Sequence, residues 1–157
     1  MRIRAKATVP QAQLVNSKSK FPAMVAGFGA GKTHALVLRT LRLIFSNGGD
    51  VAYYLPNYPL VRTIAYPRFQ AAFDDLGIPY ELNRSEHILR VGGKQIIFRT
   101  MENPDAIVGY EVADSMVDEL DTLPMAKANE VWNKIIARNR QKKPDGTPNS
   151  VAVGTTP

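Results

Sequence analysis

The stretch "VAGFGAGKTHALVLRTL" (residues 25–41) constrains the fold more than any other part of the sequence. The apolar run before it, residues 21–27, ends in glycine, as a buried strand that enters a turn does. Behind it, Val37 and Leu41 recur at helical spacing. The pattern Gly-x-x-x-x-Gly-Lys-Ser/Thr is matched except at its first position, where Ala26 replaces glycine. We therefore predict a strand, a phosphate-binding loop and a helix; a glycine-rich turn without a ligand is the alternative.

This loop keeps the groups that phosphate binding requires. Backbone N–H groups of residues 28–33 are expected to point towards phosphate oxygens at the start of the helix. Lys32 can reach the β- and γ-phosphates, and the Thr33 hydroxyl can ligate Mg²⁺. The predicted nucleotide-binding residues of the loop are Ala26, Gly27, Phe28, Gly29, Ala30, Gly31, Lys32 and Thr33.

Strand and helix patterns alternate along the rest of the chain. Strands are predicted at residues 51–56, 79–83, 87–93, 94–100, 112–119 and 150–157, and helices at 32–46, 60–77 and 127–141. This alternation predicts an α/β fold, a three-layer P-loop NTPase of RecA/ASCE-like type with a mostly parallel central sheet. Ligands bind at the carboxyl ends of the strands in such sheets, and that is where the loop and two further motifs fall.

The first of these motifs is the acid pair that follows the apolar residues Met116 and Val117. In a P-loop enzyme, Asp118 would hold Mg²⁺ and Glu119 would polarise the attacking water. The alternative is an acid pair that caps the following helix, which the helix dipole favours.

The second motif is the pair Thr155 and Thr156 at the tip of the last strand. Its hydroxyls can sense the γ-phosphate by hydrogen bonding and transmit its loss. An ordinary turn is the alternative.

Two arginines and two glutamines complete the candidate site. Arg138 and Arg140 can stabilise charge on the γ-phosphoryl group, in their own site or in a neighbour's. Contact with DNA phosphates and plain solvation are equally open alternatives. Gln11 and Gln13 precede the loop, and a glutamine amide can pair with the adenine edge. No guanine-selective Asn-Lys-x-Asp stretch occurs, so ATP is favoured over GTP.

Length and charge bound the remaining possibilities. The 157 residues suit one domain, residues 1–157, and Lys plus Arg exceed Asp plus Glu by 20 − 14 = 6. This excess suits a polyanionic partner such as nucleic acid, with solvated basic faces as the alternative. The chain has no cysteine, no secretory signal and no apolar run of about 18 residues that would cross a membrane.

Together these motifs resemble the ATPase domain of the large terminase subunit of tailed bacteriophages, the motor that packages DNA into proheads. "AGFGAGKT" resembles its Walker A motif, "MVDE" its Walker B motif and "VGTTP" its coupling motif. Gln11 resembles the adenine-sensing glutamine of the family, and "EVWNKIIARNR" the helix after Walker B. Each motif is common among P-loop ATPases, whereas their order, with the coupling motif last, is much more specific.

The resemblance implies hydrolysis of ATP with Mg²⁺ to power translocation of double-stranded DNA. It also implies a homo-oligomeric ring, the small terminase subunit and the portal protein as partners, and the cytoplasm of a bacterial host. A helicase-like or other DNA-associated P-loop ATPase, and an inert ATP-binding fragment, are the alternatives.

The sequence departs from the family pattern at two places. Many members carry an arginine inside the Walker A loop, where this chain has Phe28, so Arg138 or Arg140 would have to supply that charge. Family members also continue through a lid subdomain and an RNase H-like nuclease, whereas this sequence ends at Pro157. We therefore expect an ATPase core that lacks the lid and the nuclease.

Overall fold

A seven-stranded sheet forms the centre of the computed structural model, which describes residues 4–46 and 48–157. The strands are β1 (Ala23–Val25), β2 (Val51–Leu55), β3 (Glu81–Asn83), β4 (Ile88–Val91), β5 (Lys94–Thr100), β6 (Asp114–Asp118) and β7 (Val151–Thr155). Their order across the sheet is β1-β7-β6-β2-β5-β4-β3. The first five strands in this order run parallel to one another. Strand β4 pairs antiparallel with β5, and β3 pairs antiparallel with β4. The predicted mostly parallel sheet is confirmed.

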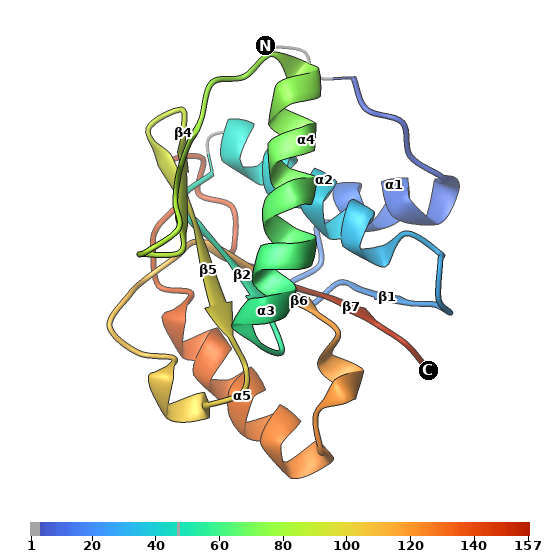
Figure 1. Cartoon of the computed structure of the whole chain (residues 1–157), viewed down its shortest axis with the longest axis vertical. Helices are drawn as coiled ribbons and strands as arrows, with labels where there is room; N and C mark the ends of the chain where they lie inside the picture. The colour runs from blue at the N-terminus through green and yellow to red at the C-terminus, as the bar shows by residue number, and fades with distance from the viewer. Residues whose placement is uncertain (1–3, 47) are drawn as a thin grey trace.

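Helices cover both faces of this sheet, which gives the three layers predicted from the sequence (Figure 1). The helices are α1 (Val9–Asn16), α2 (Lys32–Phe45), α3 (Tyr58–Leu60), α4 (Tyr66–Leu76) and α5 (Met125–Arg138). Short turns of helix are η1 (Val61–Ala65), η2 (Pro104–Ala106) and η3 (Leu120–Thr122). Helices α2 and α4 pack on one face, with α1 against α2, and α5 packs on the other. In the described part of the chain, none of these helices has the length and apolar character needed to span a bilayer.

The central strand β2 is buried on both sides. Tyr53 faces α2 and α4 and meets the rings of Phe69 and Phe98, with ring centres 5.3 and 6.2 Å away. Tyr54 belongs to the opposite cluster, which α5 covers with Val131. A strand covered on both faces reads as a continuous apolar run, and this explains why β2 shows no polar alternation.

The helical segment after β2 passes through Pro67 without ending there. The sequence predicted one helix over residues 60–77, and the structure divides it into a π-helical turn, η1, and α4. Pro67 is the second residue of α4, where the constraint of its ring on the backbone is tolerated. Gly77 caps the end of α4 with φ at 65°, in the left-handed conformation.

Two local features show where sequence patterns succeed and fail. The adjacent strands predicted at residues 87–93 and 94–100 form a hairpin: β4 and β5 pair antiparallel across Gly92 and Gly93, whose φ angles are both positive. Helix α1, in contrast, was not predicted. The sequence does carry the pattern of a helix start, a capping box with a proline in the first turn. The Gln11 side chain accepts a hydrogen bond from Thr8 N–H at 2.8 Å, and Pro10 lies in the first turn.

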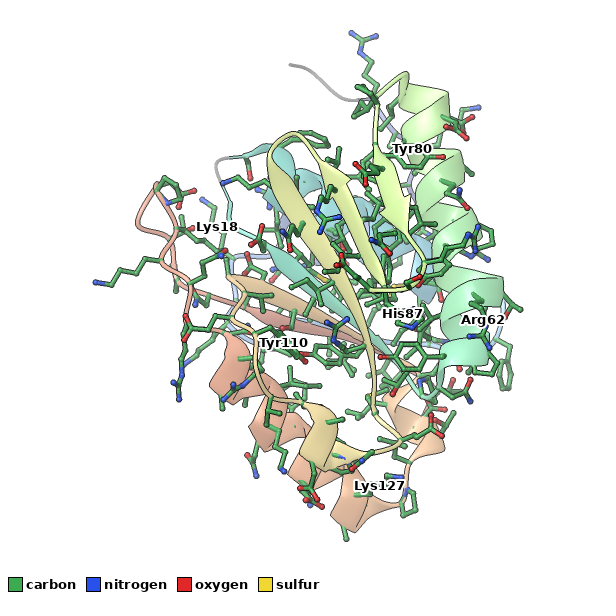
Figure 2. The ribbon with its side chains drawn as sticks, turned by 60° about the vertical axis from the view of Figure 1, so that its left-hand side comes forward. Lys18, Arg62, Tyr80, His87, Tyr110 and Lys127 are labelled. Carbon is green, nitrogen blue, oxygen red and sulfur yellow. The ribbon has the colours of Figure 1, made fainter. Side chains whose placement is uncertain are left out.

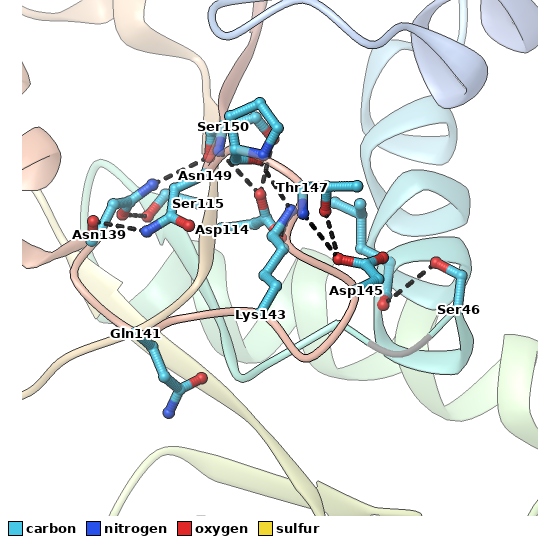
Figure 3. A network of polar contacts seen from close by, with 12 residues as sticks. Ser46, Asp114, Ser115, Asn139, Gln141, Lys143, Asp145, Thr147, Asn149 and Ser150 are labelled. Carbon is cyan, nitrogen blue, oxygen red and sulfur yellow. Dashed lines mark hydrogen bonds and ion pairs between the residues drawn. The ribbon is translucent and has the colours of Figure 1, made fainter.

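A buried polar network closes the amino-terminal ends of β6 and β7 (Figure 3). Asp114, the first residue of β6, accepts hydrogen bonds from the N–H and hydroxyl groups of Ser150, each at 2.8 Å. Lys143 forms an ion pair with the same carboxylate at 2.7 Å, and both side chains are buried. The polar loop before β7 is thereby fixed against the sheet.

Candidate nucleotide-binding site

Three chain segments meet at the carboxyl edge of the parallel strands. Strand β7 lies between β1 and β6, so the ends of all three strands are neighbours. Ala26 N–H donates to Thr155 O at 3.1 Å, and Glu119 N–H donates to Gly154 O at 3.0 Å. The glycine-rich loop, the acid pair and the threonine pair are thus brought together, as the strand-end argument predicted.

The loop enters α2 through two glycines in the left-handed region. Gly29 has φ of 76° and Gly31 has φ of 79°, and Gly31 is the N-cap of α2. A residue with a Cβ would be strained at both positions. No side chain caps α2 and its first turn carries no acid, so its first N–H groups are not engaged by side chains. Such a start of a helix favours an anion.

Lys32, the first residue of α2, folds back over this loop. Its ammonium donates to Ala26 O at 2.6 Å and to Gly27 O at 2.9 Å. The charge therefore lies along the mouth of the loop, beside the N–H groups that would receive phosphate oxygens.

Thr33 and Asp118, the two predicted metal ligands, are in direct contact. The Thr33 hydroxyl donates to Asp118 Oδ2 at 2.8 Å, and the Tyr53 hydroxyl donates to the same oxygen at 2.8 Å. Burial raises the pKa of Asp118, and these two hydrogen bonds oppose that rise. Burial also raises the pKa of Tyr53, with the charge of Asp118 adding to the rise and that of Arg68 opposing it. A hydroxyl and a carboxylate are oxygen ligands of the kind that Mg²⁺ prefers, so this pair fits the ion.

Glu119 follows Asp118 in an uncommon backbone conformation. Its φ of 59° and ψ of 40° lie in the left-handed region, which a non-glycine residue adopts at a cost. Burial raises the pKa of the Glu119 carboxyl, and the charges of Asp118 and Asp121 raise it further. The half-buried carboxylate lines the same cavity as Lys32 and Thr33. This environment makes it a stronger base than an ordinary glutamate.

Asp121 connects the acid pair to the last strand, a role that sequence reasoning missed. Its Oδ1 accepts from the Thr155 hydroxyl at 3.0 Å and from Thr156 N–H at 3.2 Å. Burial opposes ionisation of Asp121, but these hydrogen bonds hold its pKa below the ordinary value. The link depends on the pairing of β6 with β7, so no local pattern could have revealed it.

The two candidate glutamines lie in different places. Gln11 is buried against the glycine-rich loop, where its Nε2 donates to Gly31 O at 3.2 Å. Its amide oxygen accepts from Thr8, so contact with adenine would require Gln11 to exchange one of these bonds. Gln13 is exposed beside Phe21 and Val25 and does not line the loop cavity.

The two candidate arginines lie away from this cavity. Arg138 O accepts from Val112 N–H at 2.9 Å, ahead of the first residue of β6, so α5 ends at the far end of that strand. This side of the sheet, which α5 covers, can be found in Figure 2 by the labelled Tyr110. Arg140 is exposed two residues further on. A role for either arginine within its own site is not supported by this placement, and a role in a neighbour's site stays a prediction.

A different arginine, Arg68 of α4, lines the cavity with Lys32 and Glu119. No local pattern marks this arginine, because α4 is far from the loop in the chain. Phe28 projects at the loop tip with 95% of its surface exposed.

Comparison with solved structures shows the same fold in phage packaging ATPases. The large terminase of a thermophilic bacteriophage, solved with ADP, matches with a TM-score of 0.69 and 16% identity over 94% of this chain and 38% of that one. The large terminase ATPase domain of a Thermus phage matches with a TM-score of 0.66 and 17% identity over 94% and 64%. The N-terminal domain of the bacteriophage phi29 DNA packaging ATPase matches at 0.64 and 14% over 94% and 78%.

These comparisons also limit which properties of the related proteins can be assigned to this chain. The chain spans 38% of the first of these proteins, so its likeness concerns one part of a longer chain. No curated protein sequence matches it. Residues 23–154, however, match the sequence model of a family described as the terminase large subunit, T4likevirus-type, N-terminal. The chain therefore belongs to the large terminase subunit family, and its residues 23–154 correspond to the N-terminal region of that subunit.

Proposed function

We propose that this chain binds ATP with Mg²⁺ and hydrolyses it as the ATPase core of a DNA-packaging motor. One observation carries this proposal: Lys32, Thr33, Asp118 and Glu119 line a single cavity at the carboxyl edge of the sheet. This is the set of side chains that phosphoryl transfer to water needs, and it is positioned by the start of α2 and the end of β6.

Nucleotide binding would begin at the glycine-rich loop. The N–H groups at the start of α2 would receive phosphate oxygens, and Lys32 would exchange its bonds to Ala26 and Gly27 for bonds to the β- and γ-phosphates. Thr33 and Asp118 would hold Mg²⁺, which neutralises charge that develops on the phosphates. We propose that the Gln11 amide contacts adenine after its hydrogen bond to Gly31 O is broken.

Hydrolysis would depend on Glu119. Its carboxylate takes a proton from the attacking water as the water oxygen bonds to the γ-phosphorus. The bond from phosphorus to the bridging oxygen then breaks, and its electron pair leaves with ADP. The raised pKa of Glu119 brings its basicity closer to that suited to general-base catalysis at neutral pH.

Loss of the γ-phosphate would be transmitted through the contacts of Asp121. This residue bonds to Thr155 and Thr156 at the end of β7, and its neighbour Glu119 faces the cavity. A shift of the acid loop would thus move the end of the last strand. In the full motor, this movement would act on double-stranded DNA, in a ring that also meets the small terminase subunit and the portal protein. Family membership and the net charge of +6 support this setting.

The decisive experiment is a comparison of ATPase rates with and without double-stranded DNA for the wild-type chain and Glu119→Gln. We expect the variant to lose about 100-fold or more in turnover, the range for removal of a general base, with nucleotide affinity within about threefold. Glu111→Gln makes the same change at an exposed glutamate and should leave the rate unchanged. Absence of nucleotide binding would contradict the proposal, and binding without Glu119-dependent turnover would support the inert-fragment alternative.

A further inference from the structure

The cavity around the glycine-rich loop contains an excess of acidic side chains. It has a volume of about 510 Å³, and Asp118, Glu119 and Asp121 all line it. Lys32 is the one lysine among its lining residues in the described chain. A triphosphate that enters such a site adds further negative charge, so its transfer requires additional positive charge close to the phosphates.

Arg68 is placed to supply that charge from the same chain. It is the third residue of α4 and lines the cavity opposite the start of α2. Among the arginines of the described residues, it is the one that reaches this cavity. Its charge acts on the Tyr53 hydroxyl, which donates to Asp118 at the edge of the same cavity.

The backbone that carries Arg68 is held firmly. Tyr66 and Phe69 on either side are fully buried, and both rings meet Phe98 edge-on, with centres 5.1 and 5.4 Å apart. Pro67 further restricts the backbone directly before it. The arginine therefore projects from a rigid part of α4, which suits a group that must meet a ligand in a fixed geometry.

The side chain of Arg68 is not used for folding. It is exposed, and within residues 4–46 and 48–157 it makes neither a hydrogen bond nor an ion pair. Arg39 differs, because it donates to Leu14 O and to the Ser150 hydroxyl and so fastens α1 to the core. Arg42 donates to Val15 O in the same region. A free guanidinium beside a phosphate-binding loop has its five donors available for a ligand.

We propose that Arg68 contacts the γ-phosphoryl group and stabilises its charge during transfer. The inference rests on the proposed function. The planar N–H donors of the Arg68 guanidinium match phosphate oxygens. The charge is thereby supplied within one chain rather than by a neighbouring subunit.

The test compares Arg68→Ala and Arg68→Lys with the matched control Arg62→Ala. Arg62 is exposed on η1 and does not line the cavity (Figure 2). Two quantities are measured with Mg²⁺ present: ATP turnover, and affinity for ADP with and without aluminium fluoride, which mimics the transferred group. We expect Arg68→Ala to lose about 100-fold or more in turnover and at least about tenfold in affinity for the fluoride complex. Affinity for ADP alone should stay within about threefold, and Arg62→Ala should match the wild type.

The outcomes separate this inference from the proposed function. If Arg68→Ala keeps its turnover within about threefold of the wild type, and turnover still depends on Glu119, the inference is contradicted while the proposed function stands. If the wild-type chain does not turn over, the fluoride complex decides. Equal affinity of wild type and Arg68→Ala for that complex, or no preference of the wild type for it over ADP, contradicts the inference. A wild-type chain that binds no nucleotide overturns the proposed function, and this inference with it.

Discussion

At the scale of single residues, the site divides into side chains that a local motif reveals and side chains that only the fold reveals. Lys32, Thr33 and the acid pair were predictable, because their chemistry is tied to short patterns at strand ends. Asp121 and Arg68 were not, since one acts through a neighbouring strand and the other projects from a distant helix. Sequence spacing carries no information about such contacts.

The pH dependence of turnover should report the environment of Glu119. Burial, then the charges of Asp118 and Asp121, raise its pKa from the ordinary value of 4.5. A general base must be ionised, so turnover should fall as the pH drops through this raised pKa, at a higher pH than an ordinary glutamate would give. The measurement is kcat at saturating ATP between about pH 5 and pH 8.

Affinity for ADP over the same pH range serves as the control, because it shows whether the loop still binds nucleotide. A rate that stays constant down to the pH at which the chain unfolds would contradict a raised pKa for the catalytic base.

At the scale of secondary-structure elements, β6 joins the proposed catalytic site to a structural network. Asp118 ends the strand at the cavity beside the glycine-rich loop, and Asp114 begins it inside the buried network of Figure 3. Most elements followed from hydrophobic periodicity, including the β4–β5 hairpin. Helix α1 was missed because its pattern is short and weakly amphipathic. The π-turn before Pro67 was missed because it depends on how the whole segment packs.

Breaking the ion pair in this network should destabilise the chain. Lys143→Ala leaves the fully buried Asp114 carboxylate without its cation, so we expect a loss of about 3–5 kcal/mol in the free energy of unfolding. Lys142→Ala removes the same charge from the neighbouring exposed position and should change it by at most about 0.5 kcal/mol. Urea unfolding of both variants measures the difference. Equal midpoints would show that the pair contributes no stability.

At the scale of the whole molecule, the strand order creates the site. Strand β7, the last in the chain, lies between β1 and β6, so the end of the sequence is placed beside the glycine-rich loop near its start. Alternating patterns predicted the fold class, and they predicted the edge of the sheet at which the candidate site lies. They did not predict the strand order, because it arises from pairing between distant segments whose patterns are alike.

The most direct test of the proposed site is a crystal structure of this chain with Mg²⁺ and a non-hydrolysable ATP analogue. We predict phosphate oxygens on the N–H groups of residues 29–33, with Lys32 turned from the loop carbonyls to the β- and γ-phosphates. The Mg²⁺ ion should lie between Thr33 and Asp118, with Glu119 facing the γ-phosphate. A nucleotide bound elsewhere, or a Lys32 ammonium that stays bonded to Ala26 O and Gly27 O at saturating analogue, would contradict the proposal.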